Sequence, residues 1–294
     1  MKVLSFGSIN IDLLFAVDHI VKPGETIRGN SFIKSAGGKG ANQAASLAKA
    51  GLNVFMAGKT GNGAEFILEL LRSYGVNTSY VVQSSAAPGQ AVIQIDKNGQ
   101  NSIVLFPGGN EEITEEEIEK TIAGFDAGDI IVLQNEINNT DKIMTAAKDK
   151  GMKICFNPSP YSEKISSLPL NLVNRLFVNE IEGAALASLS QETAKETIVK
   201  KLISMFPNAE IILTAGENGA LYGFGGKIIK TEIVKTKTID TTGAGDTFTG
   251  FFIAAREMNK SAVESLKIAA KAAAIAVSRK GAMESIPYAR EVFN

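Results

Sequence analysis

The sequence of 294 residues contains one cysteine, one histidine and no tryptophan. Cys155 has no second cysteine with which to form an intrachain disulfide, and one Cys with one His argues against a zinc site. Cys155 lies in the apolar run 153–156, where a buried, reduced thiol is expected. A catalytic thiol is disfavoured because His19 lies far away in the sequence.

Excess charge and long apolar runs are absent too. The chain has 30 basic and 31 acidic residues, a net charge of −1, which argues against a nucleic-acid binder that works by bulk charge. No apolar run approaches the roughly 18 residues of a membrane span, and the first residues do not resemble a signal peptide. We therefore expect a cytosolic protein with no membrane segment.

What the chain has is a large apolar fraction, 45%, and 28 glycines. Short apolar runs alternate with amphipathic helical patterns that end at glycine, which predicts a doubly wound, mostly parallel sheet with helices on both faces. Two β-rich patches, about 10–35 and 88–107, do not fit this alternation. We expect one α/β domain over 1–294, with these patches forming a small β-sheet lid.

The clearest chemical signal is the run Asp240-Thr241-Thr242-Gly243-Ala244-Gly245-Asp246 before a predicted helix. Such a turn aims unpaired backbone N–H groups and the helix dipole at one point, which favours an anion. Asp246 would repel a phosphate, but it is well placed to take a proton from a hydroxyl beside one. The structural alternative is a tight turn in which Asp246 caps the helix.

A second glycine-rich run, Gly37-Gly38-Lys39-Gly40-Ala41-Asn42, also precedes a predicted helix. Its glycines would bring backbone amides close to a polar ligand, and Lys39 and Asn42 add side-chain donors. A flexible turn is the alternative. Asn10 and Asp12 follow the first strand at its carboxyl end, where α/β sheets bind ligands, although an Asx turn would use the same residues. Neither a P-loop nor a dinucleotide fingerprint is present.

Together these motifs resemble those of the ribokinase-like (PfkB) family of carbohydrate kinases over essentially the whole chain. GGKGANQA at 37–44 and DTTGAGDTFTGFF at 240–252 are similar to its two signatures. Between them lie NPSP at 157–160, the N-x-x-E pair Asn179 and Glu182, and TAGENG at 214–219, in the family's order. The resemblance implies an α/β core with a β-sheet lid, ATP as co-substrate, and phosphoryl transfer to the primary hydroxyl of a sugar.

The resemblance also implies roles for individual residues. Asp246 is the expected general base, and the backbone N–H groups of Gly243, Ala244 and Gly245 the expected anion hole. The positions expected to contact the sugar are Asn10, Asp12, Gly38, Lys39, Asn42 and Glu136. Those expected to bind the nucleotide are Asn179, Thr214, Gly216 and Gly219. The Ala-rich helix around 268–277 is a candidate neighbour of the adenine ring.

Metal ions and a partner chain are implied in the same way. Glu182 and Asn179 are expected to organise Mg²⁺, largely through water. A monovalent cation, K⁺ by expectation, would be held mostly by backbone carbonyls at Asp240, Thr242, Ala276, Arg279, Gly281 and Ser285. The resemblance further implies a homodimer that forms through the lids.

Substrate identity is left open by the sequence. The segments GGKGANQA and RKGA (279–282) favour D-ribose, converted to ribose 5-phosphate, whereas 106–110 departs from the pattern near the sugar. The alternatives within the fold are a fructokinase, another sugar kinase or a nucleoside kinase. An alternative of another class is a sugar-binding sensor without catalysis, which the presence of Asp246, the GAG turn and the N-x-x-E pair disfavours.

Overall fold

The first strand, β1 (Val3–Phe6), lies inside the larger of two sheets in the computed structural model, which describes residues 1–293. Over this range the larger sheet has nine strands in the order β13-β12-β11-β10-β9-β8-β1-β4-β5. Pairing is parallel from β5 to β11, and β12 and β13 are antiparallel. The other bounds are β4 (Val54–Thr60), β5 (Asn77–Gln83), β8 (Ile130–Gln134), β9 (Lys153–Asn157), β10 (Arg175–Asn179), β11 (Glu210–Thr214), β12 (Ala220–Phe224) and β13 (Lys227–Thr231).

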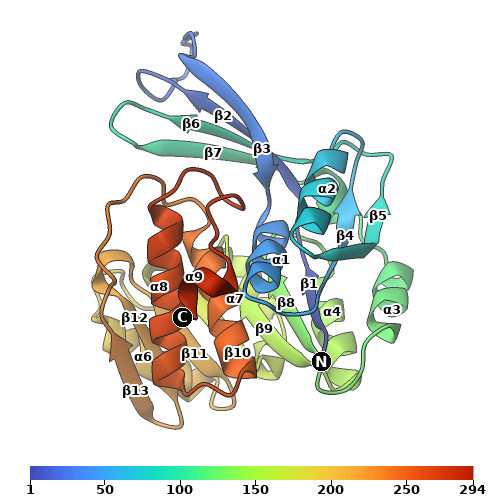
Figure 1. The fold of residues 1–294 in the computed structure, drawn as a ribbon, viewed down its shortest axis with the longest axis vertical. Helices are drawn as coiled ribbons and strands as arrows, with labels where there is room; N and C mark the ends of the chain where they lie inside the picture. Colours follow the sequence, from blue (N-terminus) through green and yellow to red (C-terminus); the bar gives the residue numbers. More distant parts are fainter. Residues whose placement is uncertain (294) are drawn as a thin grey trace.

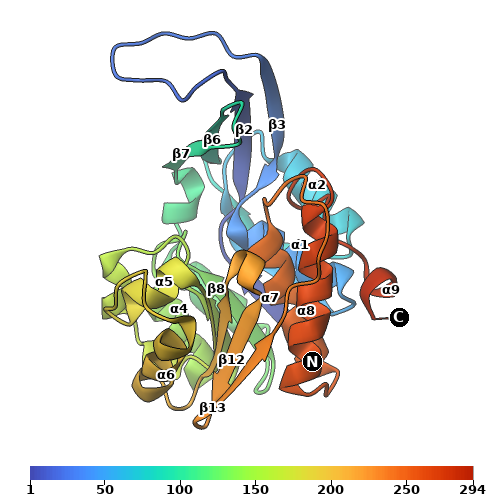
Figure 2. The same cartoon turned by 90° about the vertical axis from the view of Figure 1, so that its left-hand side faces the viewer.

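Helices cover this sheet on both faces (Figure 2). Successive side chains of a strand point to opposite faces, so Val3 joins one apolar core and Leu4 the other. The first core is closed by α1 (Lys39–Lys49), α2 (Glu65–Ser73), α7 (Ala244–Glu257) and α8 (Ala262–Val277). The second is closed by α3 (Glu115–Ala123), α4 (Thr140–Asp149), α5 (Glu180–Leu186) and α6 (Lys195–Met205). The predicted doubly wound α/β fold is confirmed.

The two β-rich patches form a separate four-stranded sheet that projects from the body of the molecule (Figure 1). Its strands are β3 (Ser31–Gly37), β2 (Asn10–Ala16), β6 (Gly89–Ile95) and β7 (Asn101–Phe106), in that order. The two outer pairings are antiparallel and the central pairing of β2 with β6 is parallel. We call these four strands the small sheet.

Short elements complete the chain. Four 3₁₀ turns within residues 1–293 are η1 (Gly108–Glu111), η2 (Glu163–Ser167), η3 (Leu170–Leu172) and η4 (Gly216–Asn218), and the short helix α9 (Ala289–Val292) packs on α8. Thr114 and Glu117, which have the sequence spacing typical of a capping box, open α3 with both reciprocal hydrogen bonds. Cys155 is fully buried, and burial raises the pKa of its thiol to about 11, so the core-thiol interpretation is confirmed.

Both glycine-rich motifs differ from the expected turn followed by a helix, because each helix begins inside its motif. Helix α1 starts at Lys39 and α7 at Ala244. Lys39 and Asp246 therefore lie in first helical turns, where N–H groups have no intrahelical acceptor. Among residues 1–293, no helix combines the length and the apolar character needed to cross a membrane.

Candidate functional site

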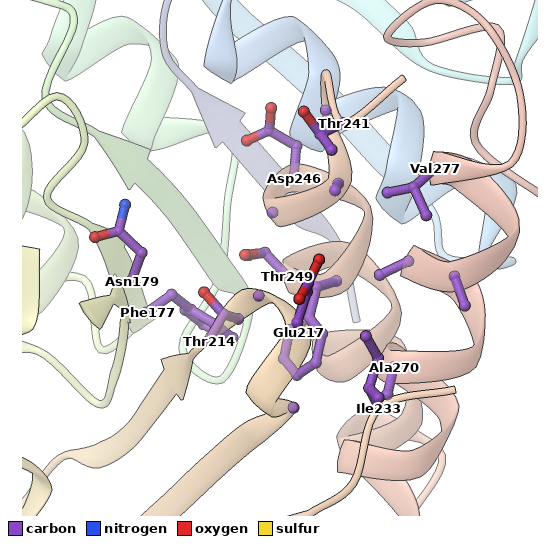
Figure 3. Close-up of a pocket in the computed structure, with 18 of the residues that line it drawn as sticks. Phe177, Asn179, Thr214, Glu217, Ile233, Thr241, Asp246, Thr249, Ala270 and Val277 are labelled. Atoms are coloured by element: carbon purple, nitrogen blue, oxygen red, sulfur yellow. The ribbon is translucent and has the colours of Figure 1, made fainter. Parts of the chain in front are cut away.

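A pocket of about 960 Å³ opens at the carboxyl ends of the parallel strands, where the N-termini of α1 and α7 also meet. Figure 3 shows Asp246 and Thr241 at one end of the pocket and Ala270 beside Ile233 at the other. The predicted site residues that line it are Lys39, Asn179, Glu182, Thr214, Gly216, Gly219, Gly243, Ala244, Gly245 and Asp246.

The polar end of the pocket is built on the first turn of α7. Gly243 is its N-cap with φ +72°, a left-handed conformation that favours glycine. A Cβ added at Gly245 would meet no heavy atom within 4 Å, so its backbone is open to an approaching group. The N–H of Ala244 makes a 3.3 Å turn bond to the carbonyl of Thr241. The arrangement suits an anion held by main-chain donors and the helix dipole.

Asp246 is buried at 6% exposure and lies between α7 and α1. Its Oδ2 accepts from Asn42 Nδ2 at 3.2 Å and its Oδ1 from Gln43 Nε2 at 2.9 Å. A simple helix cap would direct the carboxylate to its own N-terminal amides, and α7 has no side-chain cap bond. Asp246 instead faces the pocket and a second helix.

The residues predicted to contact a sugar gather beyond Asp246, where the small sheet joins the body. Gly38 is the N-cap of α1 with φ +91°, and a Cβ there would lie 2.7 Å from the carbonyl oxygen of Ser8. Glu136 follows β8, and its Oε2 accepts from the Lys39 N–H at 3.1 Å and from the Ser8 hydroxyl. From the sequence alone, Glu136 reads as a surface carboxylate at the end of a strand. In the structure its carboxylate binds the first turn of α1.

Asn10 and Asp12 lie on β2 of the small sheet. Asn10 Oδ1 accepts from Asn110 Nδ2 at 2.7 Å, while Asn110 Oδ1 accepts from the Ile9 N–H at 3.0 Å. The sequence drew attention to the segment 106–110 but not to this contact of Asn110, because the pairing joins residues 100 positions apart. It ties the chain that leaves β7 to a predicted sugar contact.

The electrostatics of this region are strongly acidic. Burial raises the pKa of Asp12 to about 7, with further contributions from Glu136, Glu284 and Asp246. Lys39 lies among the same carboxylates; burial lowers its pKa, but Asp246, Glu136 and Glu182 outweigh that effect and raise it above its ordinary value. Lys39 therefore stays protonated, and its positive charge lies among the carboxylates of Asp246, Glu136 and Glu182.

The opposite wall comes from β10, β11 and the turn after β11. Asn179 and Glu182 form a capping box at the start of α5, and Glu182 is 7% exposed. Gly219 has φ +82°, and a Cβ there would lie 2.1 Å from the carbonyl oxygen of Thr231, so the turn requires glycine. The apolar end, which lies away from Asp246, is lined by Phe248, Ala270, Ala273, Ala274, Val277 and Ile233.

Three of the positions predicted to hold a monovalent cation, Asp240, Thr242 and Gly281, are joined by hydrogen bonds. Asp240 Oδ1 accepts from the Thr242 N–H at 2.9 Å and Oδ2 from the Gly281 N–H at 3.0 Å, which joins the turn before α7 to the segment after α8. The other three positions make local bonds: the carbonyl of Ala276 accepts from the Arg279 N–H at 3.0 Å, and the Ser285 hydroxyl donates to the Ala282 carbonyl at 2.8 Å.

Comparison with known proteins decides the family. The sequence profile described as "pfkB family carbohydrate kinase" matches residues 1–289. The chain belongs to this family. It is 34% identical to a ribokinase from Haemophilus influenzae over 97% of this chain and 95% of that protein. The family assignment makes it a phosphotransferase with an alcohol group as acceptor, a ribokinase-family sugar kinase.

Solved structures of the family agree with this assignment. A ribokinase from Cryptococcus neoformans in complex with ADP superposes with a TM-score of 0.88 at 33% identity, over 99% of this chain and 98% of that one. A ribokinase from Arabidopsis thaliana complexed with ribose and ATP superposes with a TM-score of 0.85 at 30% identity, over 99% and 97%. The ribokinase-like fold is thus confirmed.

Proposed function

We propose that this enzyme is a ribokinase, which transfers the γ-phosphoryl group of ATP to the primary hydroxyl of D-ribose and releases ribose 5-phosphate. Several relatives at 31–34% identity are ribokinases, two at 30% are deoxyribokinases, and one solved structure of a ribokinase contains ribose and ATP. The observation that carries the proposal is the position of Asp246. It lies in the first turn of α7, between a pocket of nucleotide size and a cluster of polar side chains suited to a polyol.

The proposed chemistry follows from that position. Asp246 takes the proton of the sugar's primary hydroxyl as the hydroxyl oxygen attacks the γ-phosphorus. The bond between that phosphorus and the β–γ bridging oxygen breaks, and ADP leaves. Charge on the transferring phosphoryl group is stabilised by the N–H groups of Gly243, Ala244 and Gly245, aided by the helix dipole. Lys39, protonated between the acidic residues, supplies the positive side chain beside the same oxygens.

Recognition of the sugar requires several donors and acceptors that converge on hydroxyls. We assign this role to Asn10, Asp12, Gly38, Lys39, Asn42 and Glu136. Asn42 fits it well, because its Nδ2 is committed to Asp246 while its buried Oδ1 has no partner among the described residues. The small sheet would act as the lid over this subsite.

For ATP we assign the triphosphate to the region of Asn179, Thr214, Gly216 and Gly219. The adenine ring would lie at the apolar end, between Ile233 and the alanine-rich face of α8. Alanines leave a flat, narrow wall there, which suits a planar ring.

Mg²⁺ fits the donors that the structure offers. Within residues 1–293, no three His, Cys, Asp or Glu side chains cluster to hold a metal directly. Glu182 presents a buried carboxylate to the pocket, with Oε2 fixed by the Asn179 N–H at 3.0 Å. One or two carboxylates, waters and substrate phosphates are the usual donor set for Mg²⁺, which when bound neutralises charge on the triphosphate.

A monovalent cation, K⁺ in our proposal, fits the junction of the turn before α7 and the segment after α8. The donors there are mainly backbone carbonyls, at Asp240, Thr242, Ala276, Arg279, Gly281 and Ser285. Asp240 supplies a carboxylate in the same place. A cation bound there would stabilise the turn that carries the anion hole.

The small sheet also suggests how a homodimer would form. Its two edge strands, β3 and β7, carry exposed apolar side chains at Phe32, Ile33, Ile103, Val104, Leu105 and Phe106. Unpaired edge strands with apolar side chains are surfaces on which a second chain can pair. We propose that a second copy of this chain covers them.

A cytosolic location stays a prediction from the sequence.

The test is an acceptor panel: ATP-dependent phosphorylation of D-ribose, 2-deoxy-D-ribose, D-fructose and adenosine, compared by kcat/KM. D-Ribose is expected to give the largest value. A larger value for fructose or adenosine would assign the enzyme to another activity of the same fold, and turnover of none of the four would favour a sensor.

A further inference from the structure

Two buried glutamines extend inward from the proposed base. Gln43 on α1 and Gln134 at the end of β8 are both 0% exposed. Gln43 Nε2 donates to Asp246 Oδ1 at 2.9 Å, and Gln43 Oε1 accepts from Gln134 Nε2 at 2.7 Å. Fully buried amides are retained where their hydrogen bonds are needed, because burial of an unpaired polar group is costly.

The direction of these bonds is set from outside the chain of amides. The carbonyl oxygen of Phe177 can only accept, so Asn157 must turn its Nδ2 toward it, at 2.9 Å. Asn157 Oδ1 then faces Gln43 and accepts from its Nε2 at 3.3 Å. The nitrogen end of Gln43 is thereby directed at both Asn157 and Asp246, and its oxygen end at Gln134.

Within residues 1–293, Gln134 has an unpaired oxygen as a result of this arrangement. With Nε2 turned to Gln43, its buried Oε1 has no hydrogen-bond partner among the described residues. Gly7 makes room for that oxygen, since a Cβ at Gly7 would lie 1.9 Å from it. A flipped Gln134 would place its oxygen against Gln43 Oε1, so the unpaired atom follows from the same fixed direction.

We infer that Gln134, Gln43 and Asn157 form a directed amide chain that donates an N–H to the carboxylate of Asp246 and so holds it aimed at the acceptor hydroxyl. Gln43 and Gln134 are then positioning residues for the reaction. This inference rests on the proposed function, in which Asp246 is the general base. Lys39 from α1 and Asp12 from β2 are charged groups that interact with Asp246, and neither belongs to the amide chain.

Two near-isosteric substitutions test the amide chain in the full-length enzyme with ribose and MgATP at saturation. Gln43→Met removes the donor to Oδ1 of Asp246 and leaves the Asn42 donor to Oδ2 in place. We expect kcat at pH 7 to fall about 10- to 100-fold, the acid limb of the kcat profile to move about one pH unit upward, and both KM values to stay within about threefold. Gln134→Met removes the orienting donor together with the unpaired oxygen, so it should fold well and move the limb in the same direction by less.

The double variant separates a chain from two independent effects. Since Gln134 acts through Gln43, adding Gln134→Met to Gln43→Met should change kcat less than about twofold. Ser46→Ala is the matched control: Ser46 lies in the same α1–α7 interface and donates to the Thr247 carbonyl at 3.1 Å, without touching Asp246. It should leave the pH profile in place, even if the melting temperature falls.

The outcomes distinguish this inference from the proposed function. Wild-type turnover in Asp246→Asn would overturn the proposed base and the inference with it. An inactive Asp246→Asn together with unshifted acid limbs in Gln43→Met and Gln134→Met would overturn the inference alone. If Gln43→Met fails to fold, Gln134→Met still decides, because an unchanged profile in that variant contradicts an amide chain.

Discussion

Asn179 and Glu182 cap the same helix reciprocally. Asn179 Oδ1 accepts from the Glu182 N–H at 2.8 Å, and Glu182 Oε2 accepts from the Asn179 N–H at 3.0 Å. A helix start and a proposed Mg²⁺ contact are therefore the same pair of side chains. The two roles are compatible, because capping occupies one carboxylate oxygen of Glu182 and fixes where the carboxylate points.

Glu182→Gln separates the two roles. Glutamine can replace glutamate in a capping box, so the melting temperature should not change. Loss of the negative charge should raise the Mg²⁺ concentration for half-maximal activity about 10- to 100-fold, as expected for a group that holds a metal through water. A magnesium titration of initial rates measures this effect.

Glu264→Gln is the control for that titration, since Glu264 completes the exposed capping box of α8 with Ser261. It should alter neither the magnesium requirement nor the melting temperature. An unchanged magnesium requirement in Glu182→Gln would reduce Glu182 to a structural cap.

Gly245 offers a test of the anion hole that does not depend on folding. An added Cβ meets no protein atom, and its φ is not in the left-handed region, so alanine should stabilise α7 by roughly 0.5–1 kcal/mol. The same methyl group would stand beside the N–H that faces the phosphoryl group. We expect Gly245→Ala to keep or raise the melting temperature while kcat falls at least about tenfold.

Gly243→Ala should instead lower the melting temperature. A φ of +72° strains alanine and should reduce the stability of the fold by about 1–2 kcal/mol. Thermal melts and steady-state rates on both variants suffice. Normal turnover in Gly245→Ala would argue against a phosphoryl group at this position.

The raised pKa of Asp12 predicts that this carboxylate lowers the stability of the folded protein while it serves to bind the sugar. Its folded-state pKa is about 7, against an ordinary value near 3.8 in the unfolded chain. The folded state therefore holds an extra proton between these values, and stability falls as pH rises from about 4 to 7. Asp12→Asn removes this loss, so its melting temperature should exceed that of the wild type by more at pH 8 than at pH 5, while ribose binding weakens.

The exposed Asp149 on α4 is the matched control. Asp149→Asn should show no such change in the difference between pH 5 and pH 8. A difference for Asp12→Asn that is equal at both pH values would contradict the electrostatic account of the sugar subsite.

The exposed apolar edge strands of the small sheet predict that the protein forms a homodimer. Val104 on β7 is 66% exposed, and a lysine there would oppose pairing with a second chain. We expect the wild type to sediment as a dimer and Val104→Lys as a monomer. Val263→Lys, an exposed position on α8, should leave the sedimentation unchanged. A monomeric wild type would refute dimerisation through the small sheet.

Much of this architecture could be predicted from local sequence patterns. Apolar runs and glycine stops mark the strands and helices of the core, and Thr114 with Glu117 marks a helix start. The two glycine-rich motifs pointed to the site because turns and helix termini are local features. Their helices begin inside the motifs, which the pattern alone did not specify.

The contacts that orient the site could not be predicted in the same way. Gln43 and Asp246 are 203 residues apart in the sequence, and Asn10 and Asn110 are 100 apart. A glutamine on a buried helix face or an asparagine in a loop carries no local signal of such a pairing. The pKa of Asp12 likewise depends on burial and on carboxylates that the fold brings together.

The most direct test of the account is Asp246→Asn, assayed for ribose 5-phosphate formation from ribose and MgATP, with binding of ribose and of an ATP analogue measured by calorimetry. The amide keeps the shape of the carboxylate but cannot accept the hydroxyl proton. We predict that kcat falls about 10²- to 10⁴-fold while both dissociation constants stay within about threefold. Turnover close to that of the wild type would contradict the account.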